Sequence, residues 1–345
     1  MSRADRLSLV FAGLIGVAAL GAQHAPATAD PEGLLRRAIA APRSISYVGQ
    51  VETVRFSTAR ATATIERIEH RAPGMTRRWY LAPPALYGDY SITRGGSTYD
   101  VDVKHASVTV TRLPAIGDEI VPNATLALVV ANYRPLVGAQ ETVAGRAARA
   151  ITLLNKYSGE RALRIWVDDK TGLILKREAY HANGAIASVT RFEELRYTND
   201  IPTELFATTT PAGYREVVGA DVAAPTGDIQ RAVHDAGFDA ASPTYLPQGF
   251  MLVGASVDGP QGVRTLHLFY SDGVRDVSLF ENATGAAADF VRLHPHPVAI
   301  GNRSGSYVED GPTTLLAWKG KALHYVLVGD VSRGELVEIA ESIKS

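Results

Sequence analysis

Alternation of apolar and polar residues dominates the chain from residue 47 onward. The segments "YVGQVETVRF" (47–56) and "ATATIERIEH" (61–70) change character at every second position, which is the period of a strand with one buried face. Residues 77–96 and 97–113 continue as hairpins that are broken by proline, by glycine and by a Lys104–His105 turn. The alternation returns from residue 141 to about 197. The pattern therefore predicts a large antiparallel sheet of roughly nine or ten strands.

Two segments, one before this region and one within it, follow the 3.6-residue period of a helix instead. In the first, 30–41, Asp30 is placed to cap a helix whose first residue is Pro31, and Leu34, Leu35, Ala38 and Ile39 form its apolar stripe. The second, 123–134, begins at Asn123 as a possible cap, has an apolar stripe that ends at Tyr133, and is expected to end before Pro135.

The segment "RIWVDDKTGLILKREAY" (164–180) places two adjacent aspartates, Asp168 and Asp169, between two apolar strands. A general acid–base pair needs two carboxylates that face one cleft and have separated pKa values. Neighbouring residues at the end of a strand point to opposite sides, so this pair is not expected to cooperate in catalysis. We therefore interpret 168–172 as a hairpin loop in which aspartate binds local N–H groups and Gly172 takes positive φ.

A second pattern begins after a stretch, 208–227, that is rich in threonine, alanine, glycine and proline and reads as a linker. A helix is predicted at 228–236, followed by three strands and then three shorter ones. The chain closes on a helix with a capping box formed by Ser332 and Glu335. We thus expect a β-sheet domain at 30–207, the linker at 208–227 and a small C-terminal domain at 228–345.

Residues 1–29 have the pattern of a secretory signal peptide. Arg3 and Arg6 precede the uncharged apolar run Leu7–Leu20, which is short for a membrane span, and small residues offer cleavage after Ala22 or Ala29. An uncleaved membrane anchor is the alternative. No second apolar run is long enough to span a bilayer. We expect an exported protein that is soluble in the periplasm and meets the membrane only through a partner.

Composition narrows the possible functions. Removing residues 1–29 takes away two of the 35 basic and one of the 36 acidic residues, which leaves 33 and 35 and gives no basic excess for nucleic acid. The chain has no cysteine, so disulfides, lipoprotein acylation and thiolate metal sites are excluded. His294 and His296 in "HPHP" do not complete a metal site, and His70 and His234 are interpreted as surface residues. No nucleophile elbow, P-loop or dinucleotide-binding glycine pattern occurs, so we predict no enzyme, no cofactor and no metal.

The predicted sheet has only two helices to cover its concave side. A half-open barrel of this kind leaves an apolar cavity that can take an acyl chain or a hydrophobic segment of a partner. We expect the aromatic residues Trp79, Tyr80, Tyr87 and Tyr90 near its mouth; ordinary core and rim positions are the alternative for each of them. The helical residues Leu126 and Val130 complete the set of candidate ligand-binding residues.

Residues 143–197 resemble the periplasmic regulators of the MucB/RseB family. The shared features are "VAGR" (143–146), "WVDDKTGL" (166–173), Gly184 and "RFEEL" (191–195). In the second unit, "YLPQGF" (245–250), "LFYSDGVRDVSLFE" (268–281) and "ELVEIAESI" (335–343) are similar to the small C-terminal domain of that family. More distantly, the first unit is similar to lipoprotein carriers of the LolA and LppX type.

The resemblance implies an α+β chain with a curved antiparallel half-open β-barrel wrapped over helices, followed by a smaller α+β domain with an antiparallel sheet. It implies a negative regulator of an envelope-stress sigma-factor pathway, which binds the periplasmic part of a single-span anti-sigma factor and senses an acyl chain or another lipid in its cavity. Two other readings stay open: a periplasmic lipid or lipoprotein carrier of the LolA type, and a scaffold without a ligand.

Overall fold

The computed structural model describes residues 30–56, 61–112, 122–181, 183–221, 227–259, 264–283, 295–310 and 313–343. The predicted signal peptide and both cleavage sites lie outside these residues. Residues Pro31–Ser345 form one compact unit. Within the described residues, the structure has no helix with the length and apolar content needed to cross a bilayer.

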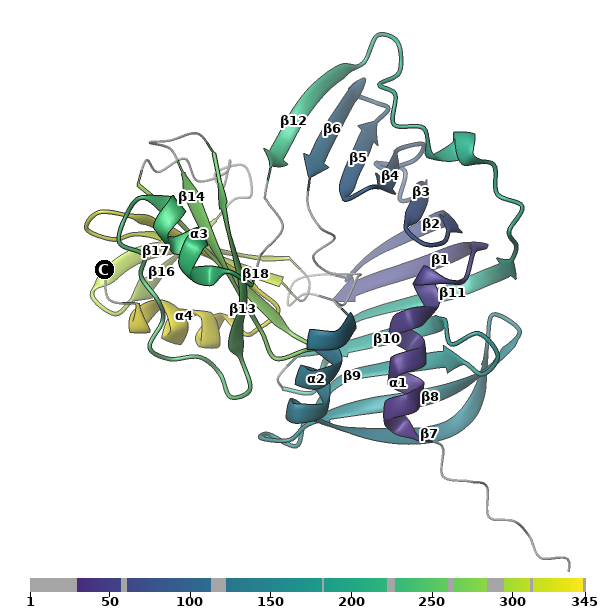
Figure 1. The fold of residues 1–345 in the computed structure, drawn as a ribbon, viewed down its shortest axis with the longest axis horizontal. Coiled ribbons are helices and arrows are strands. Elements are labelled where there is room, and N and C mark those ends of the chain that lie inside the picture. The colour runs from purple at the N-terminus through teal and green to yellow at the C-terminus, as the bar shows by residue number, and fades with distance from the viewer. Residues whose placement is uncertain are drawn as a thin grey trace, which may run out of the picture. The chain divides into compact units, whose positions relative to one another are not determined.

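A sheet of twelve strands, called the large sheet here, occupies the first part of this unit (Figure 1). Its strand order is β12-β6-β5-β4-β3-β2-β1-β11-β10-β9-β8-β7. The strands are β1 (Tyr47–Phe56), β2 (Ala61–Arg71), β3 (Met75–Ala82), β4 (Tyr90–Arg94), β5 (Ser97–Asp102), β6 (Ser107–Arg112), β7 (Tyr133–Val143), β8 (Arg146–Asn155), β9 (Arg161–Asp168), β10 (Ile174–Tyr180), β11 (Ile186–Tyr197) and β12 (Arg215–Asp221). The terminal strands β12 and β7 are not neighbours, so the sheet is open.

The prediction of a purely antiparallel sheet needs one correction. Strand β12 pairs with β6 in parallel, with Arg215 opposite Ser107 and Val218 opposite Val110, whereas the other strand pairs of the large sheet are antiparallel. This strand falls inside the predicted linker 208–227. The short run Glu216–Val218 does not stand out in the sequence, because threonine and proline precede it and small residues follow it. It pairs as a strand because the chain returns to the edge of the sheet. The domain boundaries at 207 and 228 stay predictions.

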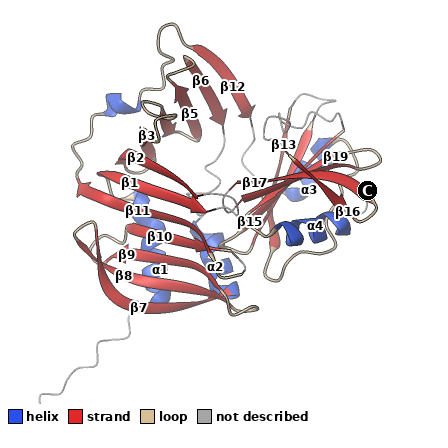
Figure 2. Cartoon of the chain, turned by 180° about the vertical axis from the view of Figure 1, so that it is seen from behind, coloured by secondary structure: helices blue, strands red, loops and turns tan. Residues whose placement is uncertain are grey.

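Helices α1 (Pro31–Ala40) and α2 (Pro122–Asn132) lie on the same face of the large sheet, over strands β7 to β10 (Figures 1 and 2). The apolar stripe predicted for α1 is buried at Leu34, Leu35 and Ala38. Helix α2 ends earlier than predicted, because Tyr133 already pairs with Asn155 as the first residue of β7. Pro135 therefore lies in an edge strand rather than ending a helix, a place where a missing N–H is tolerated.

The small sheet has seven strands in the order β13-β14-β15-β19-β18-β17-β16. They are β13 (Met251–Asp258), β14 (Thr265–Ser271), β15 (Asp276–Asn282), β16 (His296–Ile300), β17 (Arg303–Asp310), β18 (Thr313–Lys319) and β19 (His324–Gly329). Strand β16 is not among the strands predicted from the sequence, because the prolines of "HPHP" interrupt the alternation that indicates a strand. His296 is the first residue of that strand and opposes Tyr307; His294 lies outside the described residues.

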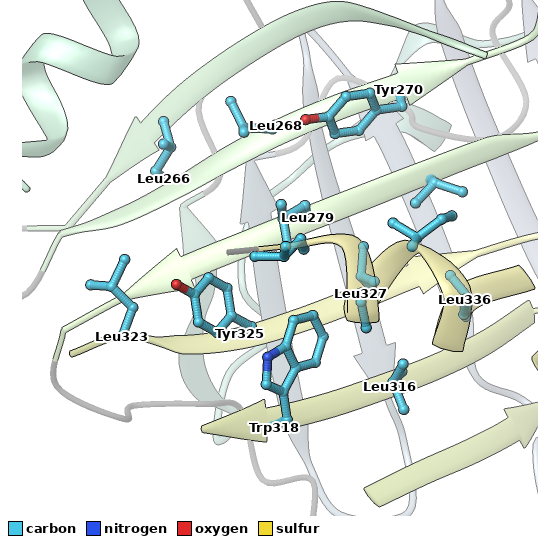
Figure 3. Close-up of a cluster of buried hydrophobic side chains, with 14 of the residues drawn as sticks. Leu266, Leu268, Tyr270, Leu279, Leu316, Trp318, Leu323, Tyr325, Leu327 and Leu336 are labelled. Atoms are coloured by element: carbon cyan, nitrogen blue, oxygen red, sulfur yellow. The ribbon is translucent and has the colours of Figure 1, made fainter. Parts of the chain in front are cut away.

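Helices α3 (Ile229–Ala236) and α4 (Arg333–Ser342) pack into one core with the small sheet. Leucines from the central strands, including Leu268, Leu279 and Leu327, meet Leu336 of α4, and Trp318 stacks on Tyr325 at 5.0 Å between ring centroids (Figure 3). The capping box predicted at α4 is present, since the Ser332 side chain accepts from the N–H of Glu335 and the Glu335 side chain accepts from the N–H of Ser332. Strand β19 alternates between buried and half-buried residues, as expected for a sheet that is covered on one face.

Candidate binding site

Trp79 and Tyr90 form an aromatic pair on neighbouring strands of the large sheet. They are register partners on β3 and β4, and their rings stack at 5.4 Å between centroids with 12° between the planes. The guanidinium carbon of Arg77 lies 4.7 Å from the centroid of Trp79 and 5.2 Å from that of Tyr90. Stacking across strands and cation–π attraction both stabilise this hairpin. Two of the candidate residues are thus brought together, over an arginine that the sequence analysis did not select.

The other candidate residues are dispersed. Tyr80 follows Trp79 along the strand and so points to the opposite face of the sheet. Tyr87 lies in the loop between β3 and β4 with 70% of its surface exposed. Leu126 and Val130 are half-buried on α2. The assignment of these residues to a ligand site stays a prediction, since strand alternation separates side chains that are close in the sequence.

Tyr80 and Tyr90 line a pocket of about 270 Å³ beside this hairpin. That volume is slightly smaller than the range of about 300–1,000 Å³ that is typical of small-molecule sites. The lining residues are Tyr80, Leu86, Asp89, Tyr90, Asp100, Val101, Asp102, Ser107 and Thr109. Three aspartates from β5 and from the loop before β4 make the pocket acidic. Its chemistry suits a hydrogen-bond donor or a cationic group better than an acyl chain.

Each of these aspartates has a different environment. Asp89 accepts a hydrogen bond from the N–H of Val103 at 2.8 Å. Asp102 has a lowered pKa because the side chain of His105 and its N–H both donate to it, at 2.7 and 2.8 Å. Burial raises the pKa of Asp100. Burial, followed by the nearby Glu66 carboxylate, raises the pKa of the Tyr80 hydroxyl, so it stays protonated and available as a donor.

Asp168 and Asp169 turn the chain, as predicted. The Oδ1 atom of Asp168 accepts from the N–H groups of Lys170 and Thr171 at 2.8 and 2.9 Å, and Gly172 has a φ of +82°. A Cβ added to Gly172 would meet the carbonyl oxygen of Arg37 at 3.0 Å, so the turn also fits closely against α1. The glycine is required here both by backbone conformation and by space.

Asp168 also has a role that the sequence did not reveal. Its carboxylate is 1% exposed, pairs with the Arg146 guanidinium and accepts from the Tyr197 hydroxyl at 3.1 Å. Burial alone would raise the pKa of Asp168, but the hydrogen bonds from Arg146, Thr171 and Lys170 outweigh it and hold the pKa below its usual value. The carboxylate is therefore a charged structural anchor, and the "VAGR" and "WVDDKTGL" segments meet at this ion pair.

The described residues contain no group of three histidine or carboxylate side chains that could hold a metal ion. His70 was predicted to lie at the surface, but the structure shows that it is buried. Its Nδ1 lies 2.8 Å from the Thr76 hydroxyl, its Nε2 lies 2.7 Å from the carbonyl oxygen of Pro42, and its ring stacks on Tyr47. The side chain is buried because the connection between α1 and β1, which contains Pro42, lies against it. The periodicity of one strand does not reveal such a neighbour.

Comparison with known proteins gives a family match for one segment and a fold match for most of the chain. Residues 97–210 match the model of the MucB/RseB N-terminal domain. The structure of the Pseudomonas aeruginosa MucA/MucB complex is similar to this chain with a TM-score of 0.61 and 18% identity, covering 92% of this chain and 99% of that one. MucB in complex with MucA(peri) gives 0.59 and 18%, covering 91% and 98%. MucB alone gives 0.57 and 16%, covering 92% and 98%.

No curated protein matches the sequence. The fold of the MucB structures extends over both the large and the small sheet, and the family model covers the segment that contains the Asp168 turn and its partner Arg146. Residues 97–210 thus match the MucB/RseB N-terminal domain, and the chain shares the fold of the MucB structures.

Proposed function

We propose that this protein is a periplasmic negative regulator of an envelope-stress sigma-factor pathway, which binds the periplasmic part of a single-span anti-sigma factor. The observation that carries the proposal is the coverage of the MucB complexes, which match more than nine-tenths of this chain and nearly all of their own length. Those structures contain MucB together with MucA or with MucA(peri). A regulator accounts for the presence of both sheets, since a carrier of the LolA type needs only a cavity domain.

We further propose that the open large sheet binds an acyl chain. The support is the arrangement of α1 and α2 over one face of an unclosed sheet (Figures 1 and 2). Trp79, Tyr80, Tyr87, Tyr90, Leu126 and Val130 remain the candidate contacts. The acidic pocket beside Tyr80 and Tyr90 does not suit an acyl chain. The acyl chain of a lipid would therefore contact other surfaces of these residues, and only a headgroup with hydrogen-bond donors would suit the pocket.

The experiment is crosslinking in the native host followed by mass spectrometry. A photo-crosslinking amino acid replaces Tyr87, which is 70% exposed, and in a matched control it replaces Lys321 in the exposed turn between β18 and β19. We expect capture of a single-span membrane protein that has a cytoplasmic sigma-binding segment. Capture of lipoproteins or free lipids by the Tyr87 variant but not by the Lys321 control, without such a protein, would contradict the regulator and favour a carrier.

A further inference from the structure

The junction between α2 and β7 contacts two turns of the small sheet through buried polar side chains. Asn132, the last residue of α2, donates from Nδ2 to the carbonyl oxygens of Gly249 and Asp272, both at 3.0 Å. Its Oδ1 accepts from the Tyr157 hydroxyl at 3.0 Å. Asn132 is 4% exposed, so both of its amide hydrogens are used in a site with little water.

The next residue along the chain continues this network. The Tyr133 hydroxyl donates to Oδ2 of Asp272 at 2.5 Å, and both side chains are fully buried. Arg275 donates from Nε and Nη2 to the same oxygen, each at 3.1 Å. The Oδ1 atom of Asp272 accepts from the N–H groups of Val274 and Arg275. A buried carboxylate with this many donors is fully satisfied, so its position is well defined.

Two glycines show how closely the turns approach α2. Gly273 has a φ of +96°, and a Cβ there would lie 2.6 Å from the Val129 nitrogen. Gly249 has a φ of +91°, and a Cβ there would lie 2.9 Å from Cγ of Asn132. Neither position has room for a side chain, so the contact is one of backbone against helix. The C-terminal carbonyl oxygens of α2 are held as well, since Lys156 Nζ contacts those of Val130 and Ala131 at 2.6 and 3.0 Å.

We propose that the network of Asn132, Tyr133, Asp272 and Arg275 is a latch that couples the position of α2 on the large sheet to the docking of the small sheet. Helix α2 passes into β7 without a loop, so it cannot leave its place while Asn132 and Tyr133 stay bonded to the turns at 249 and 271–275. A ligand that displaces α2 must therefore release the small sheet. By linkage, release of the small sheet frees α2 to the same extent. This inference does not rest on the proposed function.

Hydrogen–deuterium exchange of the intact chain tests the coupling from both sides. Asp272→Asn removes the charge that Tyr133 and Arg275 contact, and we expect exchange of the α2 amides at 126–132 to rise by about tenfold or more. Asn132→Ala changes the helix side, and exchange in the turn 271–275 should rise to a similar degree. Exchange within α4 serves as the internal control and should not change, which would exclude global unfolding.

A matched pair of glycine substitutions separates the contact from backbone strain. Gly273→Ala introduces a Cβ against α2, whereas Gly301→Ala places a Cβ at another positive φ, +58°, with Glu341 Cγ as its nearest neighbour at 3.9 Å. Only the first is expected to speed exchange in α2. If Asp272→Asn and Gly273→Ala both loosen the turn and leave α2 exchange unchanged, or if Gly301→Ala affects α2 equally, there is no latch.

Discussion

The Asp168 carboxylate illustrates what one buried charge does in this fold. It accepts from Arg146, from Tyr197 and from two N–H groups of its own turn. An ionised group with these donors stabilises the folded state only while it stays charged. The side chain that terminates β9 therefore determines how three segments of the large sheet meet: the turn, the start of β8 and the end of β11.

Asp168→Asn is expected to lower the free energy of unfolding by about 2–3 kcal/mol at pH 7, because Arg146 loses its buried partner. Asp169→Asn, at the adjacent and more exposed position, should cost less than about 1 kcal/mol. Because the pKa of Asp168 is lowered in the folded state, its contribution is present above the usual carboxyl range and is lost as pH falls through the lowered value. Urea unfolding at pH 7 and pH 3 measures both effects; equal costs for the two variants would contradict the anchor.

Glu281 affects the pH dependence of stability in the opposite direction to Asp168. It is fully buried, accepts from the N–H of Ala241 at 2.9 Å, and burial raises its pKa to about 7. The folded state therefore holds a proton that the unfolded chain releases near pH 4.5. The stabilisation is complete below that pH and is lost as pH rises through about 7.

We expect the wild-type protein to lose on the order of 2 kcal/mol of stability between pH 5 and pH 8 from this group. Glu281→Gln should remove most of that dependence, and Glu309→Gln, at an exposed position of β17, should leave it unchanged. Thermal unfolding at the two pH values measures the difference. A Gln variant with the wild-type pH dependence would show that another group is responsible.

The bounds of some secondary-structure elements depend on local sequence signals, and those of others depend on tertiary contacts. Helices α1 and α3 begin and end within a residue of their predicted bounds, and α4 begins at its predicted cap, because caps and apolar stripes are local. Helix α2 ends where its next residue enters a strand, so its C-terminus depends on β8 and on the small sheet. Strand β12 forms only because the edge of β6 lies beside it.

The capping box of α4 provides a test at this scale. Ser332→Ala removes the acceptor for the Glu335 N–H, 3.2 Å away, and should cost about 1 kcal/mol. Ser332→Asp should restore most of the loss, since aspartate is an equally good cap. Chemical denaturation of the three proteins gives the comparison. A neutral Ser332→Ala variant would mean that packing of Leu336 and Ile339 alone holds the helix end.

For the whole molecule, we expect the buried network between the two sheets to make the unfolding of the chain cooperative. Residues Pro31–Ser345 are one compact unit, and the two domains expected from the sequence stay a prediction. A fully buried tyrosine–aspartate bond at 2.5 Å joins the large sheet to the small one. Opening this contact leaves polar groups without their partners, so separation of the two sheets costs free energy before either sheet unfolds.

We therefore expect calorimetry of the intact wild-type protein to show a single cooperative transition, with calorimetric and van't Hoff enthalpies in agreement. Asp272→Asn should split it into two transitions or lower the ratio of van't Hoff to calorimetric enthalpy. Asp228→Asn, which changes only the N-cap of α3, serves as a control that should keep one transition. Two resolved transitions in the wild-type protein would show that the sheets unfold independently.

The sequence by itself determined the features that depend on neighbouring residues: the alternation of the strands, the helix cap at Ser332, the turn at 168–172 and the absence of cysteine chemistry. Its resemblance to MucB/RseB regulators, which the comparisons confirm, rests on such local segments. Only the tertiary structure decided the partners of Asp168, the burial of His70, the parallel strand β12 and the contact of Tyr133 with Asp272. The physical reason is that a side chain's burial and hydrogen-bond partners come from segments distant in the chain, often more than a hundred residues away.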